Sequence, residues 1–318
     1  MNIVLATDDN YAIPCATCVV SILKHNVPSD CNIFVLTTKL SDKNGALFQR
    51  IGQMYNASVR VIDVNVESLK NVAATRRFPM ANFLRLLAPY ILKDEHKAIY
   101  MDCDVLVVDE IKSLWNLNVD NYACALCEDQ NGDDITLHNA IQTDGVYYNA
   151  GVMVMNLDAW REGNITRKIV DFMAEYPERC QYPDQNAINF LLQDQILQFD
   201  YRYNLQEDLF ENQSQWKLHR RKWPAIEDAK AAPHVLHYTG WCKPWMKGCT
   251  HPLRHLYGQY RSALFDNNKV IEKKRILSEE MKSGKKRTGN KHIRRANFFM
   301  ILFIVETVAF VCYLLLCR

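Results

Sequence analysis

Short apolar runs alternate with amphipathic stretches along the first 160 residues of the chain. The apolar runs have the length of buried strands and lie at 2–7, 32–38, 58–64, 97–101, 122–127 and 152–157. Stretches with helical periodicity lie between the early runs, at 12–25, 41–55 and 80–93. This alternation predicts βαβ units and therefore an α/β fold, with a mostly parallel sheet and helices on both faces.

The length and composition are those of a folded protein. The chain has 318 residues, of which 48% are hydrophobic, enough for one large core or two small ones. No internal repeat or low-complexity linker divides the first 250 residues. We therefore expect a single domain there.

The charge is distributed unevenly. The formal net charge is +2, but residues 269–295 contain eleven Lys or Arg and carry a local charge of +8, while residues 1–268 carry −6. Twenty residues, 298–317, then form an apolar stretch interrupted by one acid, Glu306. A helix of that length spans a hydrocarbon core of about 30 Å. A buried core helix or a dimerisation helix are the alternatives, but a terminal position behind solvated charge favours a transmembrane tail.

The predicted location follows from both ends of the chain. The opening residues MNIVLATDDN have no basic region and reach acids early, which is not the pattern of a signal peptide. Lysine and arginine next to a membrane segment stay on the cytoplasmic side and are attracted to anionic lipid. We expect the folded body to lie on the cytoplasmic face of the plasma membrane, anchored at its C-terminus, with no nucleic-acid partner.

The cysteines suit a reducing compartment. Eleven of them are scattered without a regular framework. Cys124 and Cys127 form a C-x-x-C, but in a strand they point to opposite faces. Cys15 and Cys18 share one face of a helix, yet no second pair has the spacing of a zinc site. We expect free thiols without a metal or redox role.

Acidic residues follow two of the predicted strands. The first strand ends at TDDNY, and the fourth ends at DCD, which contains Asp102 and Asp104. Ligands of such sheets bind beyond the carboxyl ends of the strands, so both clusters should lie at one edge. Carboxylates two residues apart on an extended chain point the same way, an arrangement that suits Mg²⁺ or Mn²⁺ bridged to phosphate. Glycine-rich phosphate loops are missing from the sequence.

A second polar cluster lies in VLHYTGWCKPW, residues 235–245. The imidazole of His237 could complete the coordination of a metal ion held by the two aspartates, and Lys243 could contact a diphosphate. The alternative makes His237 a half-buried structural histidine and makes Trp241 and Trp245 core aromatics. Spacing alone favours the structural interpretation.

Several motifs together resemble one enzyme family. VLATDDNYAIPCATCVVSIL, FLRLLAPYIL, AIYMDCDVLV, YYNAGVMVMNLDAW, YPDQNAIN and HYTGWCKPW occur in the order and approximate spacing of the family-8 retaining glycosyltransferases. The resemblance covers roughly residues 1–255 and is greatest to the bacterial branch that adds galactose or glucose to lipopolysaccharide. It implies a Rossmann-like GT-A domain at 1–255. The charge and the apolar run predict a basic juxtamembrane segment at 256–296 and the tail helix at 297–318 beyond it.

The resemblance also implies a donor, a cofactor and a set of site residues. The donor is UDP-glucose or UDP-galactose, and the cofactor is Mn²⁺ or Mg²⁺. Asp102, Asp104 and His237 stand at the positions of the metal ligands, and Ala6, Asp8 and Asn10 match the loop that binds uridine. Gly240 and Lys243 match the loop that contacts the diphosphate. The residues placed around the donor sugar are Arg85, Asp129, Asn149, Asp184 and Gln185.

Retention of configuration requires a covalent intermediate or front-face attack. The amide of Gln185 is a poor nucleophile, which favours front-face attack, with a phosphate oxygen of UDP taking the proton of the acceptor. The family often has an acid where this chain has Asn186, which affects donor selectivity. The acceptor implied is a glycolipid or oligosaccharide. The alternatives are a glycogenin-like transferase acting on protein or glucan, and a nucleotide-sugar-binding protein that has lost catalysis.

Overall fold

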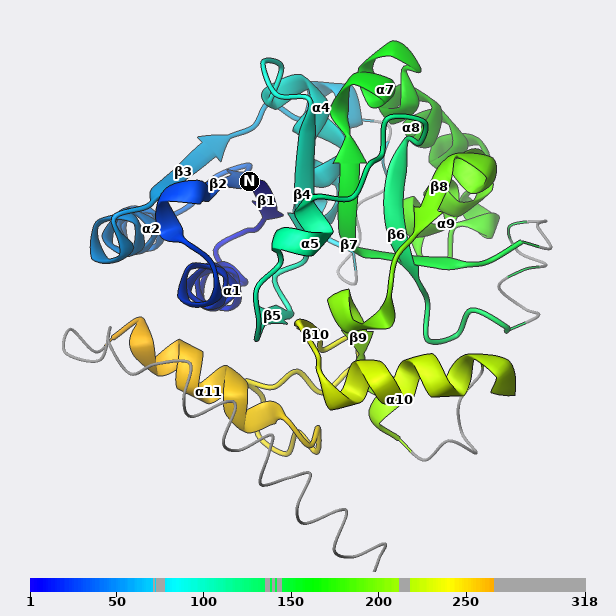
Figure 1. Cartoon of the computed structure of the whole chain (residues 1–318). Helices are drawn as coiled ribbons and strands as arrows, with labels where there is room; N and C mark the ends of the chain where they lie inside the picture. Colours follow the sequence, from blue (N-terminus) through cyan, green and yellow to red (C-terminus); the bar gives the residue numbers. More distant parts are fainter. Residues whose placement is uncertain are drawn as a thin grey trace, which may run out of the picture. The chain divides into compact units, whose positions relative to one another are not determined.

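A computed structural model of the chain describes residues 1–265, except for 71, 73–77, 135–137, 139–140, 142–144 and 212–217 (Figure 1). These residues belong to the unit Met1–Val270, the first of two units into which the chain divides. The predicted tail at 297–318 and most of the basic segment at 256–296 lie outside the described residues. Among the helices of the described part, none is long and apolar enough to cross a membrane.

A seven-stranded sheet forms the centre of this unit (Figure 1). Its strand order is β3-β2-β1-β4-β7-β6-β8. Neighbouring strands are parallel except that β7 is antiparallel to β4 and β6. The prediction of a mostly parallel sheet is confirmed, and each expected strand is present. The strands are β1 (Asn2–Ala6), β2 (Asn32–Thr37), β3 (Ser58–Asp63), β4 (Lys97–Met101), β6 (Cys124–Glu128), β7 (Tyr148–Asn156) and β8 (Ile196–Gln198).

Both faces of the sheet are covered. Every residue of β1 and of β7 is buried, as in strands packed on two sides. On one face, apolar side chains of the sheet form a single hydrophobic core cluster with those of α7, α8 and α9. On the other face, the alternate β1 positions Ile3 and Leu5 are fully buried. The longer helices are α1 (Ala12–His25), α2 (Asp42–Tyr55), α7 (Leu157–Glu162), α8 (Ile165–Glu175), α9 (Pro183–Leu192), α10 (Trp223–Ala231) and α11 (Arg254–Ala263), and α5 (Lys112–Trp115) is a single turn.

The helix α11 packs against α1 (Figure 1). The hydroxyl of Tyr260 lies 2.5 Å from Nε2 of His25, and Lys24 lies over the same tyrosine ring. Residue 255, the predicted end of the catalytic domain, therefore falls inside a helix that is part of the packed unit.

One predicted helix is wrong in detail. The stretch 80–93 forms α3 (Met80–Phe83), a 3₁₀ turn (Leu84–Leu87) and α4 (Ala88–Ile91) in place of one continuous helix. Pro89 lacks an N–H, and its ring would clash with the carbonyl of Arg85 in a regular helix. The tighter turn that results buries the side chain of Arg85, which is 5% exposed.

A second, three-stranded sheet brings distant segments together. Its order is β5 (Val105–Val107), β10 (Val235–His237) and β9 (Leu205–Gln206). The antiparallel pairing of β10 with β5 sets His237 opposite Val105, and the parallel pairing with β9 sets it opposite Gln206. The loop between β4 and β5 therefore lies next to the end of β10.

His251 lies in the segment between β10 and α11. Its ring is 5% exposed and makes edge contacts with the rings of Phe210 and Tyr238, with centroids 4.7 Å away in both cases. Its Nδ1 accepts the backbone N–H of Leu253 at 3.1 Å. Burial lowers the pKa of His251 from 6.5 to about 4, so the folded protein holds this ring neutral.

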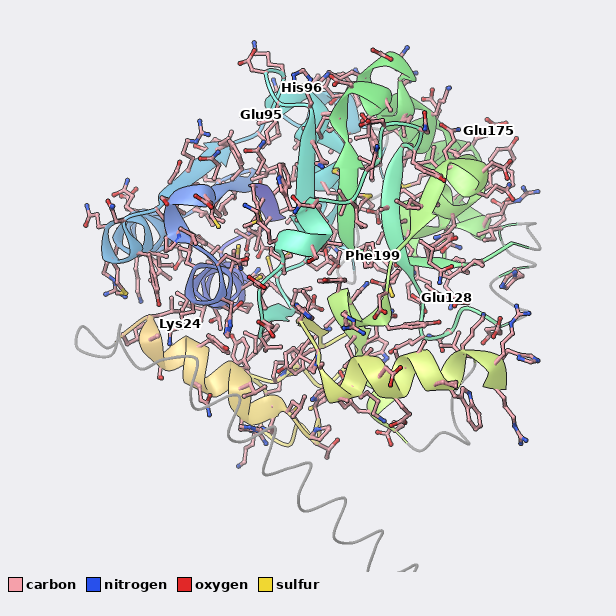
Figure 2. The ribbon with its side chains drawn as sticks, viewed as in Figure 1. Lys24, Glu95, His96, Glu128, Glu175 and Phe199 are labelled. Carbon is pink, nitrogen blue, oxygen red and sulfur yellow. The ribbon has the colours of Figure 1, made fainter. Side chains whose placement is uncertain are left out.

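The folded state should lose stability as the pH falls from about 6.5 to about 4, because in this range the unfolded chain binds a proton at residue 251 and the folded chain does not. The loss attributable to this ring is at most about 3 kcal/mol. Thermal unfolding from pH 7 to pH 4.5 should show a shallower decline for His251→Gln than for the unsubstituted chain. The control is the same substitution at the exposed His96 (Figure 2). Equal declines for all three proteins would contradict this expectation.

Candidate active site

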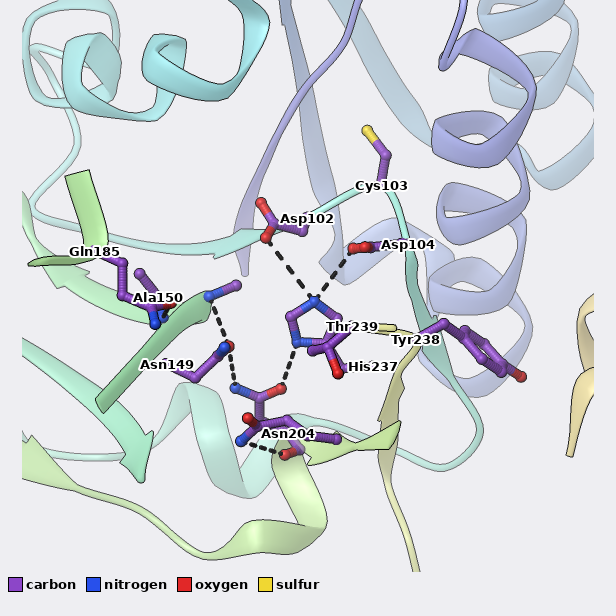
Figure 3. Close-up of polar contacts among 12 residues, drawn as sticks. Asp102, Cys103, Asp104, Asn149, Ala150, Gln185, Asn204, His237, Tyr238 and Thr239 are labelled. Atoms are coloured by element: carbon purple, nitrogen blue, oxygen red, sulfur yellow. Dashed lines mark hydrogen bonds and ion pairs between the residues drawn. The ribbon is translucent and has the colours of Figure 1, made fainter. Parts of the chain in front are cut away.

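Asp102 and Asp104 lie just beyond the carboxyl end of β4. Their side chains point to one side, whereas Cys103 points away and donates its thiol hydrogen to the carbonyl of Ala6 at 3.0 Å (Figure 3). Because β1 runs parallel to β4, the acidic residues after β1 lie at the same edge of the sheet. The prediction that the two acidic clusters share one edge is confirmed.

Each of the two carboxylates binds the protein through one oxygen and turns the other toward a common centre. Oδ1 of Asp102 accepts the hydroxyl of Tyr100 at 2.6 Å, and Oδ2 of Asp104 lies 2.8 Å from the ammonium of Lys243. The remaining oxygens, Oδ2 of Asp102 and Oδ1 of Asp104, lie 3.9 and 3.2 Å from Nε2 of His237 (Figure 3).

His237 is held in place by the second sheet. It ends β10, is 3% exposed, and is followed by Tyr238, whose backbone N–H donates to the carbonyl of Asp104 at 3.0 Å. Its Nδ1 lies 2.8 Å from Oδ1 of Asn204. Asp102, Asp104 and His237 form a set of three side chains whose ligand atoms all lie within 4.8 Å of one another.

This cluster fits a divalent cation. Oδ1 of Asp104 is buried and accepts no hydrogen bond from the described residues, so its lone pairs are available. Two carboxylate oxygens and one imidazole nitrogen form a donor set suited to Mn²⁺. The space beside them depends on Gly151 in β7, where a Cβ would lie 2.2 Å from Cε1 of His237 and 2.8 Å from Oδ2 of Asp102.

Arg85 supports the carboxylates from inside the protein. Its guanidinium lies 3.1 Å from Oδ1 of Asp102 and 2.9 Å from Oδ2 of Asp184, and it donates to the carbonyl of Ala150 at 2.8 Å. Burial by itself lowers the pKa of Arg85, but the two carboxylates raise it above its ordinary value. These bonds occupy the buried side chain, and its predicted place beside the donor sugar stays a prediction.

Lys243 and Gly240 lie in the turn after β10. Lys243 pairs with Asp104 and donates to the carbonyl of Tyr238 at 2.6 Å. Burial lowers the pKa of Lys243, but Asp104 raises it above its ordinary value. Burial raises the pKa of Asp104, but Lys243 holds it well below its usual range. Both groups are therefore charged at neutral pH.

The loop after β1 is exposed and close to Lys243. The carboxylate of Asp8 accepts the backbone N–H of Tyr11 at 3.0 Å and the amide of Asn10 at 3.4 Å. The ring of Tyr11 is 38% exposed and lies edge-on to Trp245, with centroids 5.7 Å apart. Tyr11 was not among the predicted site residues, although an exposed aromatic ring can stack on a base.

The alternative that made both tryptophans core aromatics is wrong for one of them. Trp241 is 84% exposed. Trp245 packs against the ring of Tyr257 with centroids 5.2 Å apart. The turn that carries Lys243 therefore presents one large aromatic side chain to solvent.

The polar residues predicted around the sugar form a hydrogen-bonded group. Oδ2 of Asp129 accepts from the amides of Asn149 at 3.0 Å and Gln185 at 3.1 Å. Oε1 of Gln185 accepts the backbone N–H of Ala150 at 3.0 Å, and its amide also donates to the hydroxyl of Tyr147 at 3.1 Å. The structure therefore brings Asp129, Asn149 and Gln185 together, and both ends of the Gln185 amide are already engaged.

Asn186 is fully buried and bonds within the protein. Its Oδ1 accepts the hydroxyl of Tyr147 at 2.8 Å, and its amide donates to the carbonyl of Arg179 at 2.6 Å. The hydroxyl of Tyr147 therefore links Asn186 to Gln185.

Sequence reasoning missed two residues of this site. Asn204 is fully buried and contacts His237, and Glu207 accepts the backbone N–H of Gly240 at 2.8 Å. Both belong to the segment around β9. The available signal for Asn204 was a polar residue between Tyr203 and Leu205 in the short run YRYNLQ, which Glu207 directly follows. Burial raises the pKa of Glu207, and the N–H of Gly240 and Lys243 lower it, with a net rise.

Comparison with known proteins identifies the family. The sequence model of glycosyl transferase family 8 matches residues 2–249. The chain belongs to this family. It is 28% identical to general stress protein A of Bacillus subtilis over 268 residues, which are 82% of this chain and 93% of that protein. It is 24% identical to a lipopolysaccharide 1,3-galactosyltransferase of Salmonella typhimurium, over 82% of this chain and 77% of that protein.

Solved structures show the same fold. The galactosyltransferase LgtC, crystallised with donor and acceptor sugar analogues, superposes with a TM-score of 0.76 at 24% identity, covering 84% of this chain and 97% of that one. This likeness confirms the expected GT-A arrangement. The family membership confirms the prediction that the chain is a retaining hexosyltransferase that uses a UDP-sugar.

Proposed function

We propose that this chain transfers galactose or glucose from its UDP-sugar to an acceptor of the glycolipid or lipopolysaccharide type. The observation that carries the proposal is the convergence of Asp102, Asp104 and His237, each with one ligand atom aimed at a common centre. Relatives named as lipopolysaccharide glucosyltransferase of Escherichia coli and lipopolysaccharide galactosyltransferase of Salmonella typhimurium support the acceptor class.

The three side chains are best matched to Mn²⁺. Mg²⁺ prefers oxygen ligands alone, and the imidazole of His237 therefore favours Mn²⁺. A bound divalent ion stabilises the negative charge that develops on the departing UDP. Asp102 and Asp104 hold two oxygens in place for it, and Arg85 and Tyr100 fix the orientation of Asp102.

Lys243 and Gly240 are suited to the diphosphate. The ammonium of Lys243 is 13% exposed and already bound to one anion, Asp104. The N–H of Gly240 is bound to another, Glu207. A diphosphate reaching these two donors has to take over bonds now made by carboxylates, so we expect Lys243 and Glu207 to change partners when the donor binds.

The polar group around Gln185 favours front-face attack. The Gln185 amide is held at both ends, Asp184 is paired with Arg85, and Asp129 accepts bonds from two amides. Side chains with these bonds can orient sugar hydroxyls, and the Gln185 amide is a poor nucleophile. In the proposed reaction the acceptor attacks beside the departing phosphate, whose oxygen takes the proton.

Substituting Gln185 with alanine should lower turnover by about 10- to 100-fold without abolishing it, because the amide positions the sugar and does not attack it. Steady-state rates of UDP release measure the effect. Trapping a glycosyl adduct on Gln185 or Asp184 by mass spectrometry would contradict the front-face proposal.

The proposed activity is tested by incubating the purified protein with a panel of radiolabelled nucleotide sugars, Mn²⁺ and candidate lipid or oligosaccharide acceptors. We expect UDP release from UDP-galactose or UDP-glucose and transfer of label to the acceptor. Label on the protein itself would favour the glycogenin-like alternative. Binding of the nucleotide sugars without any release of UDP would contradict the proposed activity and indicate a protein that has lost catalysis.

We also propose that residues 269–295 and 298–317 attach the enzyme to an anionic membrane at its cytoplasmic face. The eleven basic residues and the apolar run support this proposal. A chain ending at Asn297 should bind anionic vesicles in a salt-sensitive way and keep its activity on a soluble acceptor. The full chain should resist extraction by high salt and by alkaline carbonate. Release of the full chain by salt alone would contradict a spanning tail.

A further inference from the structure

A chain of hydrogen bonds links the candidate metal ligand His237 to the residues around the sugar. Nδ1 of His237 lies 2.8 Å from Oδ1 of Asn204, and the amide of Asn204 donates to Oδ1 of Asn149 at 3.0 Å. The amide of Asn149 donates to Oδ2 of Asp129 at 3.0 Å. Figure 3 shows Asn204 between His237 and Asn149, below the two aspartates. All four side chains are less than a tenth exposed.

A backbone group determines the direction of the hydrogen bonds from Asn149 to His237. The N–H of Gly151, which can only donate, reaches Oδ1 of Asn149 at 3.0 Å, so that atom is the carbonyl oxygen. The group of Asn204 that faces it must then be the NH₂, which leaves the carbonyl oxygen of Asn204 facing the ring of His237. A carbonyl oxygen only accepts, and Nδ1 of His237 must therefore carry the proton.

We propose that Asn204 is a positioning residue that holds His237 in the tautomer protonated at Nδ1. Its Nε2 then presents a lone pair toward Oδ2 of Asp102 and Oδ1 of Asp104, as a metal ligand requires. In water the imidazole of histidine favours the opposite tautomer, with the proton at Nε2 and no lone pair there. The role of Asn204 is therefore to prepare the ring for a cation, and it rests on the metal site of the proposed function.

Two substitutions separate this role from a structural one. Asn204→Asp keeps an oxygen opposite Nδ1 of His237 but places a second oxygen against the carbonyl of Asn149, so it should lower stability and leave the tautomer unchanged. Asn204→Leu removes the acceptor and should allow the Nε2–H tautomer. Asn156→Ala is the matched control, because it removes another buried asparagine, which accepts the N–H of Ala159 and caps α7 away from the site.

Binding of Mn²⁺ alone, followed by the loss of the free-ion EPR signal, is the first measurement. We expect the dissociation constant to rise about 10- to 100-fold in Asn204→Leu, as for other partners of ligating histidines. It should change little in Asn204→Asp and Asn156→Ala, even though both lower the thermal unfolding temperature. The proposal is overturned if Asn204→Leu binds Mn²⁺ with the same dissociation constant as the unsubstituted chain. It is also overturned if, in all three variants, the loss of affinity is proportional to the loss of stability.

The second measurement is the tautomer itself, by ¹⁵N NMR of the histidine rings in metal-free protein at mildly alkaline pH. Comparison with His237→Gln identifies the signals of His237. We expect Nδ1–H in the unsubstituted chain and in Asn204→Asp, and a shift toward Nε2–H in Asn204→Leu. Finding Nε2–H in the unsubstituted chain overturns the proposal. These measurements distinguish failure of this proposal from failure of the proposed function. If the protein releases no UDP but its variants differ in Mn²⁺ affinity as expected, the proposed function fails and the role of Asn204 is still supported.

Discussion

Replacing Asp104 with asparagine should reduce UDP release by more than about 100-fold, because the change removes a negative charge from the candidate metal site at the point where the leaving group develops charge. Oδ1 of Asp104, 3.2 Å from Nε2 of His237, is the ligand atom, and Oδ2 holds Lys243 at 2.8 Å. An amide keeps the shape of the side chain. It can present either an oxygen to the cation or an NH₂, and the NH₂ would repel both the cation and Lys243.

Turnover is measured at saturating donor, with and without Mn²⁺. The matched control is Asp109→Asn, which removes the same charge from an exposed position beyond β5 and should leave the rate unchanged. Undiminished UDP release by Asp104→Asn in the presence of a chelator would contradict both the metal requirement and the assignment of this ligand.

A Gly151→Ala substitution should abolish binding of Mn²⁺ and reduce turnover by a similar factor, about 100-fold or more. The added methyl would lie 2.2 Å from Cε1 of His237 and 2.8 Å from Oδ2 of Asp102. His237 has little room to move away, because it is 3% exposed and both β7 and β10 are buried throughout. The strain should also lower the stability by about 1–3 kcal/mol, the usual cost of overpacking.

The control for this variant is Gly45→Ala in α2, where a Cβ would meet nothing within 4 Å. Alanine there should raise stability by up to about 1 kcal/mol through its helix propensity and leave turnover unchanged. Titration with Mn²⁺ and a thermal unfolding curve distinguish a lost site from a lost fold. If Gly151→Ala binds Mn²⁺ as tightly as the unsubstituted chain, the cluster of Asp102, Asp104 and His237 is not where the cation binds.

Local features of the sequence were enough to predict the catalytic edge. The burial of β1 and β4 could be predicted from uninterrupted apolar runs, and parallel order from the alternation with helices. The shared direction of Asp102 and Asp104 follows from the period of two along an extended chain. These inferences held because each depends on residues close together in the chain.

Other features depended on long-range pairing. The reversal of β7 could not be predicted from its apolar pattern, because a strand buried on both sides has no alternation that reveals its direction. The break of the helix at 80–93 was predictable in principle from Pro89, but the use of that break to bury Arg85 behind Asp102 was not.

The sequence by itself therefore determined the fold class, the family and the identity of the residues at the edge of the sheet, since these are encoded in local periodicity and in motifs. Only the tertiary structure decided how those residues are oriented. The pairing of β10 with β5 and β9 aims Nε2 of His237 at the aspartates and places Asn204 behind it. The absence of a Cβ at Gly151 leaves room for the ring. These contacts join residues that are 33 to more than 80 positions apart. The physical reason that local patterns miss them is that the first depends on the pairing of β10 with β9, and the second on the close approach of β7 to β10.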